Sequence, residues 1–331
     1  MKGRAQLCMA LLTTLGVGGT AWAASPYGNV PDVQQASLGS TPQLAPTVQP
    51  PEHLFAAPTR PDRIGRVMAP VFINGRGPFR LIVDTGANQS VLTTNLVSLL
   101  GMVPGADANV RLVGVTGSAI VPTITLDSLS TGDLLQKNLK VAVLRSVSGG
   151  AEGILGMQGF QDKRITVDFV NDRIEIADSR GERAGRFFTT IPLKIRFGRL
   201  LLASGRVGGV RTHVVIDTGA ERTLGNRALL NELIRRKRLP APPSSAGVIG
   251  LTDVEQRGDA IWTRKIKIGE VNITDVNVIY GDMHVFKAWD LEDEPALLVG
   301  MDVLGVLHTI VVDYRRKELQ IRPRGARMHL F

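Results

Sequence analysis

Two Asp-Thr-Gly-Ala segments are the residues of this sequence best suited to chemistry. They begin at Asp84 and Asp217, directly after the β-branched runs 81–83 and 214–216. A carboxylate that ends a strand and precedes a small hydroxyl residue and a glycine sits on a tight turn with little bulk around it. Two such turns related by an approximate twofold axis can bring their carboxylates together, and like charges in contact hold one proton between them. One carboxylate can then take a proton from water while the other carboxyl donates to a carbonyl oxygen, which suits peptide-bond hydrolysis without a metal, serine or cysteine.

An internal repeat surrounds the two aspartates. After each aspartate comes a glycine-containing segment, then an apolar pair followed by Gly-Met, then a strand-like run. The first copy reads GVTGS at 114–118, ILGM at 154–157 and ITVDF at 165–169, and the second reads GLTDV at 250–254, LVGM at 298–301 and TIVVDY at 309–314. Because these landmarks recur in one order at similar spacing, the chain is predicted to contain two similar units that each supply one aspartate.

The remaining pattern predicts an all-β protein with two pseudo-symmetric lobes and short helices. Residues 266–279 show strand-like alternation around a glycine turn. Helices are expected at 90–100, at 226–238, and in short segments just after Gly156 and Gly300.

The domain boundaries follow from the repeat and from one change in composition. The polar, glycine-containing segment 179–185 falls between the copies and is the natural inter-lobe linker. The first lobe is then expected at 61–178 and the second at 186–324, with a tail at 325–331.

The N-terminal part of the chain is predicted to lie outside both lobes. Residues 1–23 have a positive start, an apolar run and an A-x-A site, which predicts an export signal and a periplasmic or secreted protein, with an uncleaved membrane anchor as the alternative. Segment 24–60 is rich in proline and is expected to be an extended linker, or else a propeptide that covers a cleft. The single cysteine, Cys8, falls in the signal, which argues against a disulfide scaffold or a thiolate metal site.

Residues 64–322 resemble the retropepsin-like aspartic proteases. Both Asp-Thr-Gly-Ala motifs match the catalytic motif of that family, including the alanine favoured in its retroviral branch. The short lobes resemble retroviral protomers more than the larger lobes of pepsin, and two fused lobes behind an export signal are similar to exported aspartyl proteases of bacteria. The resemblance implies a pepsin- or retropepsin-like acid protease fold and an aspartic endopeptidase without cofactor or metal.

The resemblance also assigns roles to matching positions. Asp84 and Asp217 would be the catalytic pair. The threonines after them are expected to bond across the lobe interface, the alternative being that they serve only as turn residues. The supporting residues are Thr85, Gly86, Ser90 and Gly156 in the first copy and Thr218, Gly219, Thr223 and Gly300 in the second. The flaps that cover a substrate fall on Gly114, Val115 and Thr116 and on Gly250, Leu251 and Thr252.

Two features depart from the family pattern. Retroviral enzymes usually carry Asp after the motif, where this chain has Asn88 and Glu221, so contacts to a substrate backbone are expected to differ between the lobes. Neither flap carries a tyrosine, which argues against a pepsin-style flap hydrogen bond.

Composition narrows the function classes without naming a substrate. A hydrophobic fraction of 44% and a charged fraction of 21% suit a folded globular protein, and a net charge of +9 would attract an anionic envelope surface. The basic run 235–238 ends an expected helix, which favours a solvated helix end over a nucleic-acid site. The five histidines show no metal-ligand spacing, and GxSxG and P-loop motifs are absent.

Three functions remain open at this point. The first is an aspartic endopeptidase that hydrolyses extracytoplasmic proteins with a water activated by the two aspartates, as a monomer containing an internal pseudo-dimer. Its substrate pockets are expected to be apolar, with walls such as Val115, Ile120, Leu251 and Ile279. The second is a catalytically idle peptide-binding module on the same fold. The third is a glycosidase that acts on envelope polysaccharide, whose two carboxylates would stand farther apart than a dyad that shares a proton.

Overall fold

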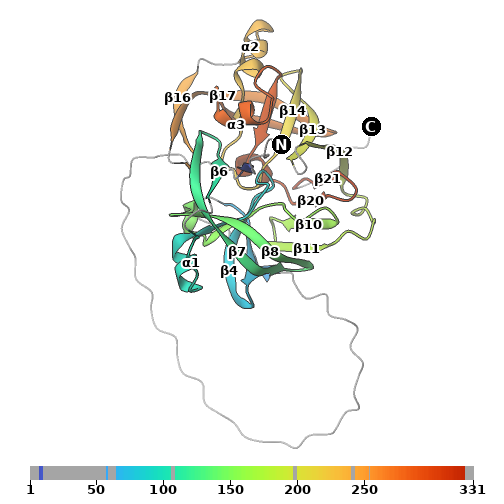
Figure 1. Cartoon of the computed structure of the whole chain (residues 1–331). Coiled ribbons are helices and arrows are strands. Elements are labelled where there is room, and N and C mark those ends of the chain that lie inside the picture. Colours follow the sequence, from blue (N-terminus) through green and yellow to red (C-terminus); the bar gives the residue numbers. More distant parts are fainter. Residues whose placement is uncertain are drawn as a thin grey trace, which may run out of the picture. The chain divides into compact units, whose positions relative to one another are not determined.

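The computed structural model describes residues 7–9, 57–58, 65–105, 109–196, 200–239, 243–252 and 254–324. The rest of the predicted export signal, nearly all of segment 24–60 and the tail 325–331 lie outside the described residues. Strands dominate the described part and helices are short, which confirms the all-β class (Figure 1). None of the helices described there has the length and apolar character needed to cross a bilayer.

The first copy of the repeat forms a sheet that contains both parallel and antiparallel strand pairs. Its elements are β3 (Met68–Ile73), β4 (Arg76–Val83), β5 (Val91–Thr93), α1 (Thr94–Leu99), β6 (Asn109–Val113), β7 (Ser118–Thr131), β8 (Leu134–Leu144), a 3₁₀ turn (Ser148–Gly150) and β9 (Gly153–Leu155). Strand β4 runs parallel to β9, and β5 lies between β8 and β9. A further short strand, β1 (Leu7–Met9), pairs with β6 at the edge.

The second copy repeats this arrangement strand for strand. Its elements are β13 (Leu200–Val207), β14 (Val210–Ile216), β15 (Leu224–Gly225), α2 (Arg227–Arg235), β16 (Ser244–Ile249), β17 (Glu255–Ile268), β18 (Val271–Tyr280), α3 (His284–Ala288), β19 (Ala296–Val299) and α4 (Met301–Leu304). Strand β14 runs parallel to β19, as β4 does to β9, and β15 lies between β18 and β19. The internal repeat read from the sequence is therefore a repeat of structure.

The strands that carry the aspartates are buried on both faces. Leu81, Ile82 and Val83 at the end of β4 and Val214 to Ile216 at the end of β14 are fully inaccessible to solvent. A continuous apolar run can form a strand only where both faces are covered, and neighbouring strands and helices provide that cover here. Each aspartate thus follows a strand that is fixed in the middle of its lobe.

The two copies meet in a sheet to which both contribute. Strand β10 (Lys163–Asp168) pairs on one side with β11 (Arg173–Asp178) and on the other with β20 (Thr309–Asp313) of the second copy. The order continues from β20 through β21 (Glu318–Arg322) to β12 (Thr189–Arg196) (Figure 1). At the far edge, β2 (Ala57–Pro58) pairs with β11. The strand-like runs that end the two copies therefore lie side by side.

The segment between the lobes is held against this shared sheet. The Ser179 hydroxyl donates to the buried carboxylate of Asp313 at 2.8 and 2.9 Å. The Ala184 amide donates to the side chain of Gln320, and Arg183 pairs with Glu318 at 2.8 Å. Hydrogen bonds from Arg183 and from Arg316 lower the pKa of Glu318 to about 2. These contacts tie residues 179–184 to the strands of the second copy.

Three helix predictions need correction. Residues 91–93 form β5, because they pair with β8 and β9, and Thr93 caps α1, so the first helix is shorter than predicted. The second, α2, ends at Arg235. No helix follows Gly156, because Gly159 adopts a positive φ of 78° that interrupts a helix, whereas α4 follows Gly300 as expected. Helix α3 was not predicted.

Candidate active site

Asp84 and Asp217 occupy equivalent turns in the two lobes. The backbone amide of Asp84 donates to Leu155 on β9, and that of Asp217 donates to Val299 on β19, each at 3.1 Å. The Oδ1 atom of Asp84 accepts from the amides of Gly86 and Ala87 at 2.9 and 2.8 Å. These bonds fix one oxygen of the carboxyl and leave Oδ2 for contact with other groups.

The second carboxyl is held in the same way. The Oδ1 atom of Asp217 accepts from the amides of Gly219 and Ala220 at 2.9 and 3.2 Å. A side chain at Gly219 would overlap the carboxyl of Asp84, so glycine is required for the two turns to approach this closely. The sequence analysis assigned Gly86 and Gly219 supporting roles, and the structure places both against the carboxyls.

The two carboxyl groups are fully buried and their turns approach closely, since a Cβ at Gly219 would overlap Cγ of Asp84. Burial, followed by the nearby charge of Asp84, raises the pKa of Asp217 well above its ordinary value, although the amide of Gly219 partly opposes this shift. Oδ2 of Asp217 is buried without a hydrogen-bond partner among the described residues, so it can share a proton with the neighbouring carboxyl of Asp84. The pair is therefore arranged to hold one proton between two oxygens, and its titration belongs to the pair.

The threonines that follow the aspartates cross between the lobes. The Thr85 hydroxyl donates to the carbonyl of Ile216 at 2.7 Å, and the Thr218 hydroxyl donates to the carbonyl of Val83 at 2.6 Å. Each hydroxyl also accepts from the backbone amide of the other threonine, at 3.1 and 3.2 Å. Four buried hydrogen bonds thus fix the relative position of the two aspartate turns.

We expect Thr218→Val to destabilise the protein by about 2–4 kcal/mol, because a buried carbonyl and a buried amide each lose a partner. Urea unfolding measures this loss. The matched control is Thr212→Val on β14, the strand that leads into the turn, where a buried hydroxyl donates to Val210 at 2.9 Å within one lobe. Its expected loss is about 1 kcal/mol. Equal losses in the two variants would contradict a special role of the inter-lobe bonds.

A hydroxyl residue and a glycine support each turn from behind. Ser90 accepts from the amide of Gly156 at 3.1 Å, and Thr223 accepts from the amide of Gly300 at 3.2 Å. A side chain at Gly156 would overlap the backbone of Gln89, so this close approach also requires glycine. All eight supporting positions assigned from the sequence lie in or directly behind the two turns.

Gln158 and Asp302 are supporting residues that the sequence analysis missed. Gln158 accepts from the Ser90 amide at 2.9 Å, and Asp302 accepts from the amide and the hydroxyl of Thr223 at 3.0 and 2.6 Å. Burial raises the pKa of Asp302, while its bonds to Thr223 oppose that shift. Both residues stand two positions after the glycine of the apolar-apolar-Gly motif. The shared spacing from the glycine could have identified them. It was missed because one copy has glutamine at this position and the other has aspartate.

The predicted flaps are hairpin turns whose tips meet. The turn between β6 and β7 carries Thr116, whose hydroxyl accepts from the amide of Gly250 at the turn between β16 and β17, at 3.2 Å. Val115 is fully buried among side chains of the second lobe, and its carbonyl accepts from the amide of Val285 at the start of α3, at 3.1 Å. Leu251, in turn, packs against an apolar cluster of the first lobe. The flaps therefore interlock, and each tip reaches the opposite lobe.

The flap tips meet, and the aspartate pair is fully buried. Of the four residues expected to line apolar substrate pockets, Val115 and Ile279 are buried and Leu251 is partly buried, all in clusters beside the turns. Ile120 is 69% exposed on β7, so it does not line a pocket in this closed arrangement. Entry of a peptide requires the flap tips to separate.

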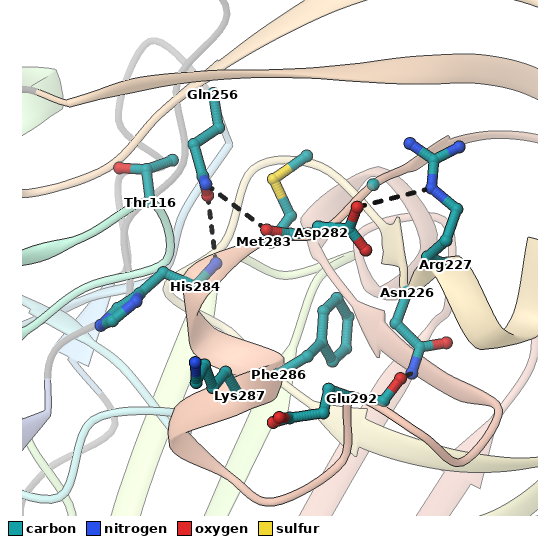
Figure 2. A pocket seen from close by; sticks show the side chains of 11 residues that line it. Thr116, Asn226, Arg227, Gln256, Asp282, Met283, His284, Phe286, Lys287 and Glu292 are labelled. Atoms are coloured by element: carbon teal, nitrogen blue, oxygen red, sulfur yellow. Dashed lines mark hydrogen bonds and ion pairs between the residues drawn. The ribbon is translucent and has the colours of Figure 1, made fainter.

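A pocket of about 230 Å³ lies beside the flap tips in the second lobe (Figure 2). Thr116 forms one edge, and Phe286, His284 and Lys287 from α3 form another. Gln256 on β17 accepts from the amide of His284 at 3.0 Å and so connects the second flap to α3. Neither aspartate lines the pocket, so it is a neighbouring site and not the place where a reacting bond would lie.

The described residues contain no cluster of three or more histidine, cysteine or acidic side chains that could hold a metal ion. The chemistry available from the arrangement is that of two buried carboxyls with one shared proton. Such a pair activates a water molecule and protonates a carbonyl oxygen in one step.

Two pseudo-symmetric β lobes with paired Asp-Thr-Gly turns define a retropepsin-like aspartic protease. A family model for aspartyl proteases matches residues 69–158 and 203–303, which is more than half of the chain and includes both copies. The chain belongs to this aspartyl protease family.

Structural comparison agrees with this assignment. The fold is similar to the crystal structure of an aspartic proteinase from Irpex lacteus, with a TM-score of 0.50 and 14% sequence identity, covering 79% of this chain and 95% of that chain. At this level of identity the likeness concerns the fold. A comparison with curated protein sequences gives no match.

Proposed function

We propose that the protein is an aspartic endopeptidase in which Asp84 and Asp217 activate the attacking water. The observation that carries this proposal is the close approach of two buried aspartate turns, with a raised pKa at Asp217. The charged member of the pair takes a proton from water, and the protonated member donates to the carbonyl oxygen of the scissile bond. The backbone amides bind Oδ1 of each aspartate, so the two Oδ2 atoms remain for these proton transfers.

The flaps support a peptide as the substrate. A peptide that enters after the tips separate would lie extended between the flap hairpins and the aspartate turns, where backbone hydrogen bonds and side-chain pockets can recognise it. We place this activity outside the cytoplasm, because residues 1–23 have the pattern of an export signal. A monomer suffices, since one chain supplies both aspartates.

The geometry of the site bears on two alternative functions, a glycosidase and a catalytically idle peptide-binding module. A glycosidase needs its carboxyls about 5–9.5 Å apart to accommodate a sugar and water, which disfavours that activity for two turns that approach as closely as these do. A catalytically idle peptide-binding module has one observation in its favour, namely that both aspartates are fully buried while the flap tips meet. Activity therefore depends on whether the flaps open.

A digest of a diverse peptide mixture tests the proposal. The mature protein is expected to cut peptides at internal bonds, and the same preparation with Asp84→Asn is expected to leave them intact. Cleavage should persist in the presence of a metal chelator. Binding of peptides without any cleavage over a wide pH range would instead establish the idle module, and cleavage that survives Asp84→Asn would refute the aspartate mechanism.

A further inference from the structure

A row of cations crosses three neighbouring strands on the outer face of the second lobe. In the register of the sheet, Arg206 on β13 lies directly opposite Arg211 on β14 and directly opposite Lys267 on β17. Adjacent strands are only about 4.8 Å apart, and like charges directly opposite one another destabilise a sheet. Arg206 thus has a cation on each side.

Little within the protein compensates for this repulsion. Lys267 pairs with Glu270 at 3.2 Å, but the side chain of Glu270 is 82% exposed, so the pair is of the weak surface kind. One guanidinium nitrogen of Arg206 donates to the carbonyl of Gly209 at 3.2 Å. In the part of the chain that the structure describes, neither arginine forms an ion pair with a carboxylate.

The cations line a shallow groove of about 510 Å³. Ser204, Gly205 and Gly269 contribute small residues to its lining, and Glu270 is its one acidic residue. The groove is therefore roomy, polar and positively charged.

We infer that this groove binds a ligand with two or more adjacent phosphate groups. Arginine forks match the oxygens of a phosphate and bind them through paired, charge-assisted hydrogen bonds. The row spans two strand spacings, about 10 Å, which exceeds the width of one phosphate and fits a short run of them. Such a ligand supplies the negative charge that the sheet lacks between Arg211 and Lys267. The site lies outside the aspartate pair and the flaps, so it acts in binding and not in hydrolysis.

The basic run 235–238 at the end of α2 provides a control for the cations of the groove. Arg235 and Arg236 both pair with Glu232, at 2.7 and 2.6 Å, so each of these arginines already has a carboxylate partner. Loss of Arg235 removes the same charge from the same lobe without touching the groove.

Calorimetric titration of the mature protein with tripolyphosphate at low salt tests the inference. Arg206→Thr and Arg211→Thr are each expected to weaken binding about tenfold or more, because a charge-assisted hydrogen bond is lost, whereas Arg235→Thr should leave binding unchanged. Without ligand and at low salt, Arg206→Thr should raise the melting temperature, which a structural role of this arginine would not do. Peptide cleavage should stay the same in all three variants.

Additional binding experiments identify the source of the phosphate groups. Binding to vesicles that contain phosphatidylglycerol but not to phosphatidylcholine vesicles would indicate a lipid surface, and binding to tripolyphosphate alone would indicate a soluble or polymer-borne phosphate. Two results would overturn the inference. One is equal tripolyphosphate binding by the wild type, Arg206→Thr and Arg211→Thr. The other is the absence of binding by the wild type.

Discussion

Asp217→Asn is expected to abolish peptide cleavage, with turnover lowered about a thousandfold or more, while the protein remains folded. Asparagine retains an Oδ1 that accepts from Gly219 and Ala220, so the turn keeps its shape. It cannot hold or release the shared proton, so the water is no longer activated. Asp84→Asn is expected to have the same effect, because each carboxyl has a separate part in proton transfer. Initial rates on a cleaved peptide measure the loss.

The same substitution is expected to stabilise the protein at pH values above the folded pKa of Asp217. Burial and the charge of Asp84 raise that pKa in the folded state. A carboxyl with a raised pKa favours folding below its unfolded pKa of about 3.9, and that contribution is lost as the pH rises through the folded value. Above the folded value both carboxyls are charged and repel each other, and Asp217→Asn removes this repulsion. Urea unfolding across a pH series should show a gain in stability that grows as the pH rises through the folded pKa of Asp217.

Asp313→Asn provides the matched control for both measurements. Asp313 is also fully buried, but it accepts from Ser179 in the shared sheet and lies outside the aspartate pair. This variant should lose stability and keep most of its activity. If Asp217→Asn instead retained near-normal turnover, or lost the same stability at every pH of the series, the assignment of the proton-sharing pair would be wrong.

A disulfide across the flap tips is expected to switch the enzyme off reversibly. A Cβ built at Gly117 would lie 3.5 Å from the Cβ of Val254, within the range found in disulfides. The chain's single cysteine, Cys8, falls in the predicted export signal and would not interfere. Oxidised Gly117→Cys/Val254→Cys should lose activity by more than about tenfold, because a lid that cannot open excludes the substrate. Reduction with dithiothreitol should restore it.

The two single-cysteine variants control for changes in packing at the tips, and oxidation should not alter their activity. Mass analysis would establish that the bond has formed within one chain. Full turnover by the cross-linked double variant would mean that peptides reach the aspartates without separation of Gly117 from Val254. In that case the flaps would not act as the gate.

The catalytic pair, the repeat and the fold class could be predicted because each leaves a local mark in the sequence. An apolar run followed by Asp-Thr-Gly indicates a strand and a tight turn by itself, and the second copy at Asp217 supplies the partner. Gly114 and Gly250 indicated the hairpin turns through glycine and through their spacing from the two aspartates. These features need little information from distant parts of the chain.

The features that the sequence did not reveal depend on distant partners. The alternation of residues 165–169 indicates a strand but not that β10 pairs with β20 of the other copy. Val115 is apolar, but the residues next to it in the sequence do not predict that its side chain is buried in the opposite lobe. Helix α3 spans only five residues, which is too short for a helical period to stand out.

The shared sheet also has a consequence for how the chain is made. Ser179 and Asp313 are 134 residues apart, so β10 and β11 emerge long before β20 and β21 exist to pair with them. At roughly 5–20 residues per second, the delay is on the order of ten seconds. During that interval β10 presents an unpaired edge that can recruit strands from other chains. Completion of the fold therefore waits for the last strands to be synthesised, and a chaperone that shields this edge would serve the first half of the chain more than the second.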